Sequence, residues 1–174
     1  MKRPNPTSIE KTFRPDEIIV SKTDTKGIIT YGNEVFISVS GYSERELIGT
    51  PHSLIRHPDM PRVIFKLLWD TLAEKKEVFA YVKNLAKDGS YYWVYANVTP
   101  SFDLKGRVIG YHSMRRKPAP EAVKTIEPIY ALLLEAEREG GMEASSKRLE
   151  AMLHQEGKSY EEFVARLHRR YPVT

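Results

Sequence analysis

The 174-residue chain has 27 lysine and arginine residues, 23 aspartate and glutamate residues and no cysteine, and 41% of it is hydrophobic. That composition supports one domain with a real core and excludes a wholly disordered chain, while the missing cysteine excludes disulfides, thiolate nucleophiles and thiolate-ligated metals. The basic residues are interspersed with acidic ones, which argues against nucleic-acid binding, and no apolar run reaches the roughly 18 residues of a membrane span. Since the N-terminus also lacks the apolar core of a signal peptide, we expect a cytoplasmic protein with no membrane span.

The chain begins with a segment that we expect to be flexible, residues 1–17. Two β-prone runs between residues 18 and 29 then flank a tight turn at 24–27, which predicts a hairpin. Apolar spacing predicts a first helix over residues 33–40, and Ser43 with Glu46 forms the pattern of a capping box that starts a second short helix.

The next segment, PHSLIRHPDMP at residues 51–61, contains three prolines. Proline density of this kind disfavours a regular helix or strand and predicts a rigid, turn-rich segment. An amphipathic helix follows from Pro61 to about Glu74. Three longer β-prone segments come after it, at residues 78–85, 90–102 and 107–115.

This order of elements predicts an α+β fold, a five-stranded antiparallel sheet with helices on one face. The unit that these elements form spans residues 18–117. Residues 118–174 show helical spacing only, so we expect an appended helical tail, in which Ser159 and Glu162 repeat the capping-box pattern.

Strand alternation places Asn84 on one face of the sheet together with small and medium apolar residues: Val78, Ala80, Val82, Val94 and Ala96. A buried asparagine in such surroundings needs hydrogen-bond partners, and these come either from a ligand or from backbone at a turn. Trp93 and Tyr95 alternate onto the opposite face. There they are expected to pack against the N-terminal segment, the tail helices or a second subunit.

Several of these stretches together carry a resemblance to a known family. The run GNEVFISVSGYSERELIGTPHSLIRHPDMP, followed by VKNLAKDGSYYWVYANVTP and IGYHSMR, closely resembles the FAD-binding PAS domain of bacterial aerotaxis transducers. The resemblance covers about residues 20–130. It implies a PAS fold with a cavity between sheet and helices, non-covalent FAD in that cavity, and control of chemotaxis signalling as the output.

The resemblance also implies a set of cofactor-binding residues: Asn33, His52, Arg56, His57, Asp59, Trp69, Asn84 and Arg115. In the family, the residues matching Arg56, His57 and Asp59 are needed to retain flavin. Flavin-binding PAS domains bond the ring edge at the position of Asn84, and light-sensing relatives place a glutamine near the flavin N5 at that of Arg115. From the residues alone, an ion pair that pins the loop explains Arg56 and Asp59 equally well, and Arg115 also fits a solvated charge run that ends the strand.

The sequence departs from the family at two points. Val78 stands where the family often has tryptophan, so Phe79 or Trp69 would have to supply that ring contact. The sequence shows no counterpart of the receptors' membrane anchor and methyl-accepting region. We therefore expect a stand-alone redox or oxygen sensor that signals to a protein in trans, such as a chemoreceptor, a coupling protein or a histidine kinase.

Two other functions remain open at this point. The chain could bind haem through His52, His57 or His112, as oxygen sensors of the PAS superfamily do, or it could be a cofactor-free interaction module. A homodimer is compatible with either, because PAS sheets often pair. We expect no enzyme, because the sequence has no Gly-rich phosphate loop, nucleophile elbow or zinc-protease motif.

Overall fold

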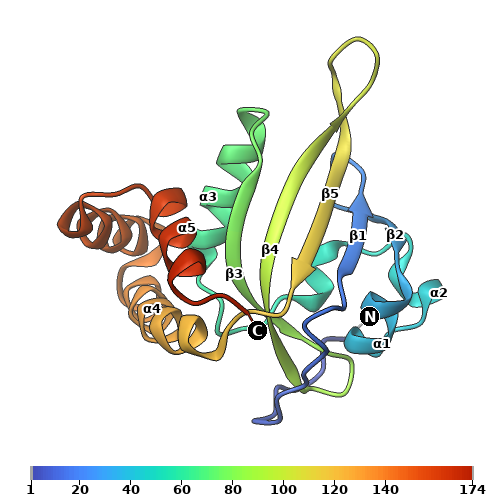
Figure 1. Ribbon diagram of the computed structural model, residues 1–174, viewed down its shortest axis with the longest axis horizontal. Coiled ribbons are helices and arrows are strands. Elements are labelled where there is room, and N and C mark those ends of the chain that lie inside the picture. Colours follow the sequence, from blue (N-terminus) through green and yellow to red (C-terminus); the bar gives the residue numbers. More distant parts are fainter. Residues whose placement is uncertain (1, 174) are drawn as a thin grey trace.

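A five-stranded antiparallel sheet forms the centre of the computed structural model, which describes residues 2–173 (Figure 1). Met1 and Thr174, the outer ends of the two terminal segments, lie outside the described residues. The strands are β1 (Ile19–Thr23), β2 (Ile29–Gly32), β3 (Val78–Leu85), β4 (Tyr91–Phe102) and β5 (Val108–Arg116). Their spatial order is β2-β1-β5-β4-β3, so the first hairpin joins the sheet beside the last strand. The α+β prediction and the five strands are confirmed.

One face of the sheet is covered by the short helices that follow β2. They are α1 (Glu34–Ser40), α2 (Glu44–Leu47), the 3-10 turn η1 (His52–Ile55) and α3 (Arg62–Ala73). Gly41 ends α1 with φ 75°, and the capping box of Ser43 and Glu46 forms at α2 as predicted. The proline-bounded segment does contain one 3-10 turn, because the residues between Pro51 and Pro58 suffice for a single i→i+3 turn.

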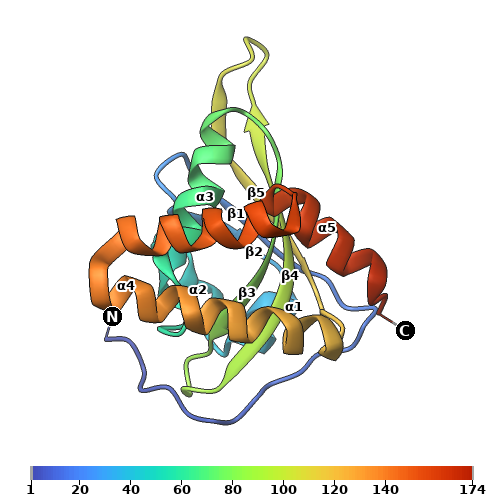
Figure 2. The same ribbon diagram turned by 90° about the vertical axis from the view of Figure 1, so that its left-hand side faces the viewer.

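The tail covers part of the opposite face, so helices lie on both sides of the sheet rather than one (Figures 1 and 2). Helix α4 (Pro120–Glu156) bends back at Gly140 and Gly141, and α5 (Tyr160–Arg170) follows it. The tail packs there because strand alternation leaves large aromatic residues on that outer face, as the sequence predicts. Trp93 packs against Tyr130 at 6.2 Å between ring centroids, and Tyr95 stacks on His168 at 4.1 Å.

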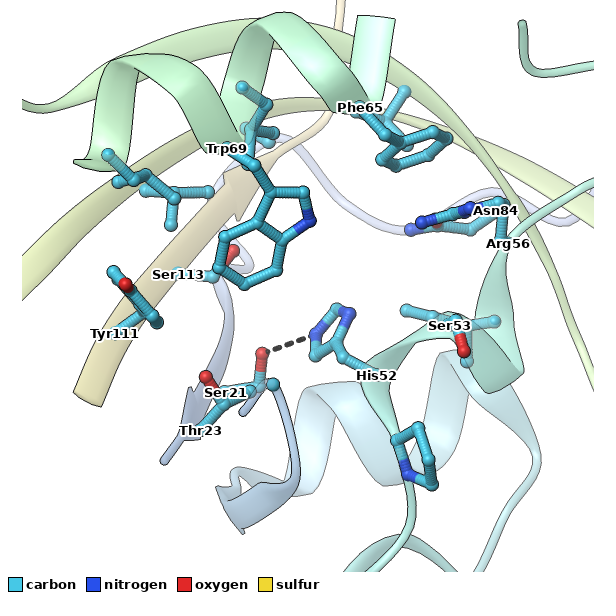
Figure 3. Close-up of a pocket in the computed structure, with 18 of the residues that line it drawn as sticks. Ser21, Thr23, His52, Ser53, Arg56, Phe65, Trp69, Asn84, Tyr111 and Ser113 are labelled. Carbon is cyan, nitrogen blue, oxygen red and sulfur yellow. Dashed lines mark hydrogen bonds between the residues drawn. The ribbon is translucent and has the colours of Figure 1, made fainter. Parts of the chain in front are cut away.

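A cavity of about 350 Å³ lies between the inner face of the sheet and α3, η1 and the β1–β2 turn (Figure 3). The sequence explains this space in two ways. Ala96 and Ser113 are small residues on the inner face, and the proline-bounded segment lines one side of the cavity without filling it. The volume falls within the usual range of small-molecule sites.

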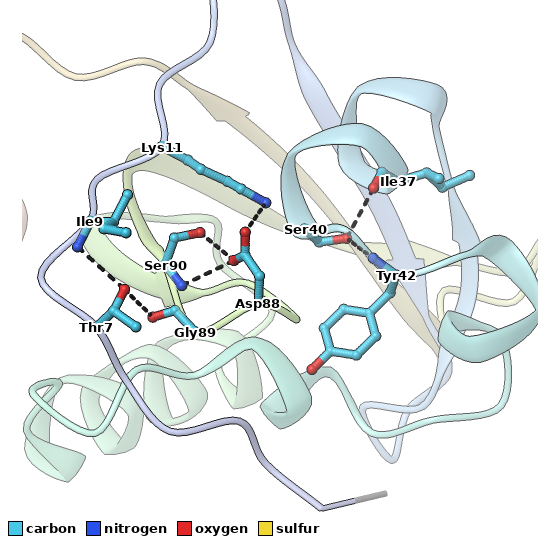
Figure 4. Close-up of polar contacts among 9 residues, drawn as sticks. All are labelled: Thr7, Ile9, Lys11, Ile37, Ser40, Tyr42, Asp88, Gly89 and Ser90. Atoms are coloured by element: carbon cyan, nitrogen blue, oxygen red, sulfur yellow. Dashed lines mark hydrogen bonds and ion pairs between the residues drawn. The ribbon is translucent and has the colours of Figure 1, made fainter.

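The N-terminal segment, which we expected to be flexible, has specific contacts in the structure (Figure 4). The backbone amide of Thr7 donates to the carbonyl of Gly89 at 2.8 Å, and that of Lys11 donates to Tyr91 at 2.7 Å. The ammonium group of Lys11 lies 3.2 Å from the Asp88 carboxylate. Residues 2–17 contain no helix or longer strand, yet they are bonded to the turn between β3 and β4.

Among residues 2–173, no helix combines the length and the apolar character that crossing a bilayer requires.

Candidate ligand-binding cavity

The cavity has a polar end and a more apolar end (Figure 3). Asn84 and Arg56 lie at one end, Tyr111 lies at the other, and Trp69 lies between them. Apolar side chains make up most of the wall: Ile55, Phe65, Leu68, Leu72, Val82, Ala96 and Val98. None of the described residues that line the cavity is acidic, whereas two of them, Arg56 and Arg115, are arginines.

Asn84 lies on β3 with its side chain in the cavity wall and is 4% exposed. The register of β3 and β4 pairs Asn84 with Tyr92, Val82 with Val94 and Ala80 with Ala96. This arrangement agrees with the inner face that strand alternation predicts. The Tyr92 hydroxyl is buried there and has no hydrogen-bond partner among the described residues, and burial raises its pKa to about 12.

Arg115 lies on β5 in the cavity wall and is 2% exposed. Burial lowers its pKa to about 10, a value at which the guanidinium is still cationic at neutral pH. Its Nη2 donates to the hydroxyl of Ser21, whereas Nε and Nη1 have no partner among residues 2–173. Arg115 is therefore a buried cation with free donors, and the solvated charge run that the sequence left open does not describe its position.

Ser21 connects Arg115 to His52. The Ser21 Oγ lies 2.9 Å from His52 Nε2 (Figure 3). Because an arginine can only donate, the Ser21 hydroxyl accepts from Arg115, and its own hydrogen is available to a neutral His52 imidazole. Burial, followed by the charges of Arg115 and Arg56, lowers the pKa of His52 to about 3.

Arg56 enters the cavity from the proline-bounded segment. Its guanidinium carbon lies 3.7 Å from the ring centroid of Phe65, a cation–π contact, and its buried Nε has no partner in the part of the chain that the structure describes. The backbone of Arg56 forms an isolated antiparallel bridge with Asn84, which ties the segment to the edge of the sheet. The two polar residues therefore reach the same end of the cavity.

His57 and Asp59 lie outside the cavity wall. His57 is 3% exposed, and its Nδ1 accepts the backbone N–H of Asp59 at 3.0 Å. Asp59 pairs instead with Lys83 on the outer face of β3, with 2.9 Å between the Lys83 ammonium and the carboxylate. In the structure these two residues fix the segment that presents Arg56. The ion pair considered between Arg56 and Asp59 does not form among the described residues, because the Asp59 carboxylate pairs with Lys83.

Asn33 also lies away from the cavity. Its side-chain oxygen accepts the backbone N–H groups of Val20 and Phe36, both at 3.0 Å, so it caps α1 and joins that helix to β1.

The two aromatic residues expected to compensate for Val78, Trp69 and Phe79, lie on opposite faces of the sheet. Trp69 lines the cavity and is 41% exposed, which places it at the rim beside Gly27. Phe79 lies on the outer face, stacked on Tyr95 with 5.7 Å between centroids, so Trp69 and not Phe79 is the aromatic residue available to compensate for Val78.

Of the three histidines considered for haem, His52 alone lines the cavity. His112 lies on β5, where strand alternation turns it away from the inner-face residues Tyr111 and Ser113. Within residues 2–173, no cluster of three or more potential metal ligands occurs.

The sequence did not point to several of the polar wall residues: Ser21, Thr23, Lys26 and Ser53. Serine and threonine on a short strand carry no pattern that separates a cavity residue from a solvated one. The alternation that placed Asn84 inside also places Ser113, which occurs opposite Val98 in the β4–β5 ladder. Ser21 can be assigned to the cavity wall only once β1 is known to pair with β5, because that pairing sets Ser21 opposite Ser113.

The comparisons with known proteins agree with this architecture. The PAS fold family model matches residues 29–115, half of the chain. The chain belongs to the PAS family. It is 41% identical over 118 residues to the aerotaxis receptor of Escherichia coli, an alignment that covers 68% of this chain and 23% of the receptor. It is 31% identical over 99 residues to a nitrogen fixation regulatory protein of Klebsiella pneumoniae, covering 57% of this chain and 20% of that protein.

Solved PAS-like structures match the fold at lower sequence identity. A light-oxygen-voltage domain studied with a flavin analogue superposes with a TM-score of 0.56 at 20% identity, covering 63% of this chain and 82% of that one. The light-state structure of the Aureochrome1 photoreceptor domain gives 0.54 at 22% identity, covering 70% and 91%. The PAS chain spans less than a quarter of the curated relatives named here, so it is related to one domain of each.

Proposed function

We propose that this chain is a redox or oxygen sensor domain that holds FAD non-covalently in the cavity and passes its state to a signalling protein. The observation that carries the proposal is a pair of arginines in the cavity wall. Arg115 and Arg56 present buried N–H donors that have no partner among residues 2–173, and none of the described wall residues is acidic. Because unpaired buried donors are costly, a ligand that brings acceptors to these two arginines supplies what the protein lacks.

The wall suits an isoalloxazine ring. The pyrimidine part of a flavin carries carbonyl acceptors and an N–H donor, which Asn84, Arg56 and Arg115 can bond, and its dimethylbenzene part is apolar, like the wall at Leu68 and Leu72. Lys26 lies at the exposed rim and would place a positive charge near a pyrophosphate. The relationship to the aerotaxis receptor supports FAD over other ligands.

Bound flavin supplies reversible electron transfer. The chain's own residues would bind the ring edge and exclude water from it, and burial keeps His52 neutral in the same cavity wall. A change in charge on the ligand would change which hydrogen bonds Arg115 and Arg56 can make. This would shift the balance between two arrangements of the loop and strands that carry them.

The partner is proposed to be a protein in trans. The named relatives are a receptor and a regulatory protein, so a chemoreceptor, a coupling protein or a histidine kinase is the class of partner that we propose, with a homodimer compatible with each. The tail helices α4 and α5 pack on the outer face of the sheet and are the surface proposed to report the ligand state.

Limited proteolysis of the FAD-loaded protein tests the sensor function. We expect the tail to be cut at a different rate in oxidised protein and in protein reduced with dithionite, with the ligand-free protein as a reference. Identical digestion of the two loaded forms would argue against a sensor. A parallel titration of ligand-free protein with FAD and haemin separates the flavin proposal from a haem domain, because haem uptake with a Soret band would favour His52 as an axial ligand.

A further inference from the structure

Glu137, on helix α4 of the tail, reaches the first turn of the cavity helix α3. Its Oε2 accepts the backbone N–H of Arg62 at 2.8 Å, and its Oε1 accepts from the Arg62 Nε at 2.6 Å. Arg62 is the first residue of α3, and 75 positions separate the two residues in sequence. The Glu137 side chain is 10% exposed, so the contact is largely shielded from water on the tail side.

Helix α3 has no side-chain cap of its own. Pro61 is its N-cap residue, and proline offers neither a side-chain acceptor nor an N–H. The first amides of a helix lack partners within the helix, so a carboxylate that accepts one of them stabilises the first turn and also complements the positive end of the helix dipole. Glu137 provides this acceptor from outside the region that the PAS fold model matches.

The turn that Glu137 caps also forms the polar end of the cavity. Phe65, three residues after Arg62, supports the Arg56 guanidinium at 3.7 Å, and the same helix contributes Leu68, Trp69 and Leu72 to the wall. Loosening the first turn of α3 would therefore move the surface on which Arg56 rests.

The tail is positioned to transmit such a movement. The Tyr130 hydroxyl donates to the carbonyl of Tyr81 on β3 at 2.7 Å and also lies 2.8 Å from the Tyr160 hydroxyl of α5. The backbone departs from helical angles at Gly140 and Gly141, within one helical turn after Glu137, with φ 71° at Gly141. The half of α4 that carries Glu137 is thus bonded to the sheet edge and ends at a bend.

We propose that Glu137 is a positioning residue for the cavity: by capping α3 from the tail, it couples docking of α4 to occupancy of the cavity. The inference rests on the proposed function insofar as the ligand is FAD. Coupling between two binding events is reciprocal, so a docked tail strengthens ligand binding and the ligand strengthens tail docking by the same factor. The tail is then part of the binding site's support as well as its output.

The test uses the full chain with Glu137→Ala and Glu137→Gln. Glutamine retains an acceptor for the Arg62 amide but lacks the charge, so it should restore part of what alanine loses. The matched control is Glu135→Ala, because Glu135 is exposed on the same helix two residues away. The FAD dissociation constant is measured by quenching of flavin fluorescence. Hydrogen exchange is followed over residues 62–73 and 120–156, with and without FAD.

We expect Glu137→Ala to weaken FAD binding about threefold to tenfold, as expected for the loss of one helix cap. Glu137→Gln should give a smaller loss, and Glu135→Ala should behave as the wild type. FAD should slow exchange of the tail in the wild type and should do so less in Glu137→Ala. A merely structural role would lower stability without removing this protection.

Two results would overturn the inference. One is an FAD dissociation constant of Glu137→Ala equal to that of Glu135→Ala, and the other is tail exchange that does not respond to FAD in a wild-type protein that binds it. A wild type that takes up no FAD counts against the proposed function instead. The inference is then judged on the ligand-free proteins, where Glu137→Ala must speed exchange of the first-turn amides of α3, and unchanged exchange rejects it.

Discussion

Individual side chains at the polar end of the cavity determine which ligands it can hold. Arg115 and Arg56 contribute donors that have no acceptor among the described residues, and Asn84 contributes an amide that can both donate and accept. The group as a whole carries positive charge and has more donors than acceptors. A neutral ring with carbonyl groups or an anion satisfies it, whereas a cationic ligand does not.

Replacing Asn84 by alanine should weaken FAD binding by about tenfold, because the ring edge would lose one or two hydrogen bonds, each worth roughly 1 kcal/mol. Asn97→Ala is the matched control. Asn97 lies on the neighbouring strand β4 outside the cavity and donates to Glu77 at 3.1 Å. Flavin fluorescence quenching measures both variants, and equal affinities would remove Asn84 from the binding site.

The pH dependence of stability should carry a contribution from His52. Its pKa is about 3 in the folded protein against an ordinary value of 6.5, so the unfolded chain binds more protons between these values. The free energy of unfolding should therefore fall as the pH drops from about 6.5 toward 3, by at most about 1.4 kcal/mol per pH unit from this residue.

The variant His52→Gln removes this contribution. Its stability, from urea denaturation of the ligand-free protein, should decline less steeply than that of the wild type over the same pH range. His154→Gln, on the exposed surface of α4, controls for the loss of an imidazole elsewhere. Parallel curves for wild type and His52→Gln would mean that His52 is not held neutral.

Among the larger elements, the N-terminal segment packs closely against one glycine in the turn between β3 and β4. Gly89 has φ 89°, and a Cβ there would lie 2.2 Å from the carbonyl oxygen of Asn5. Gly106 has φ 74° but faces open space. Both glycines tolerate a left-handed conformation that alanine resists at a cost of about 1 kcal/mol, but only at Gly89 does a methyl group also collide with the segment.

Gly89→Ala should therefore lower the free energy of unfolding by more than Gly106→Ala does, and it should release residues 2–17 to proteases. Urea denaturation and limited proteolysis followed by mass spectrometry measure the two effects. If both variants lose the same stability and keep the segment protected, the contacts in Figure 4 do not hold it.

How well the sequence predicts each feature depends on how far apart along the chain the interacting residues lie. Local signals were sufficient for the capping boxes at Ser43 and Ser159, and strand alternation was sufficient to place Asn84 inside and Trp93 outside. Contacts between distant segments had no local signal. Neither the Ser21 bridge to Arg115 nor the Glu137 cap on α3 could be inferred without the packing of β1 on β5 and of α4 beside α3.

The resemblance was sufficient to predict the family and the cavity, but it assigned Arg56, His57 and Asp59 to flavin binding as one set. The structure separates them, because adjacent residues in an irregular segment point in different directions. Arg56 enters the cavity, while His57 and Asp59 bond to the backbone and to Lys83 on the other side of β3. Loss of flavin in variants of His57 or Asp59 would thus follow from displacement of Arg56.

The whole molecule is a PAS domain whose sheet has the cavity for the proposed ligand on one face and the tail helices on the other. Lys83 on β3 bonds Asp59 of the loop at 2.9 Å and approaches Glu127 of α4 at 3.8 Å, so the edge strand connects the two faces. Cavity and tail are thereby linked through a few contacts at β3 and α3, and the proposed sensor function requires such a link.

The absorption spectrum of the protein as purified, followed by heat release and chromatography of any chromophore, is the most direct test of FAD binding. We expect a structured flavin band in the visible region and FAD in the supernatant. A colourless protein that does not take up added FAD would contradict it and leave an interaction module, and a Soret band would contradict it in favour of haem.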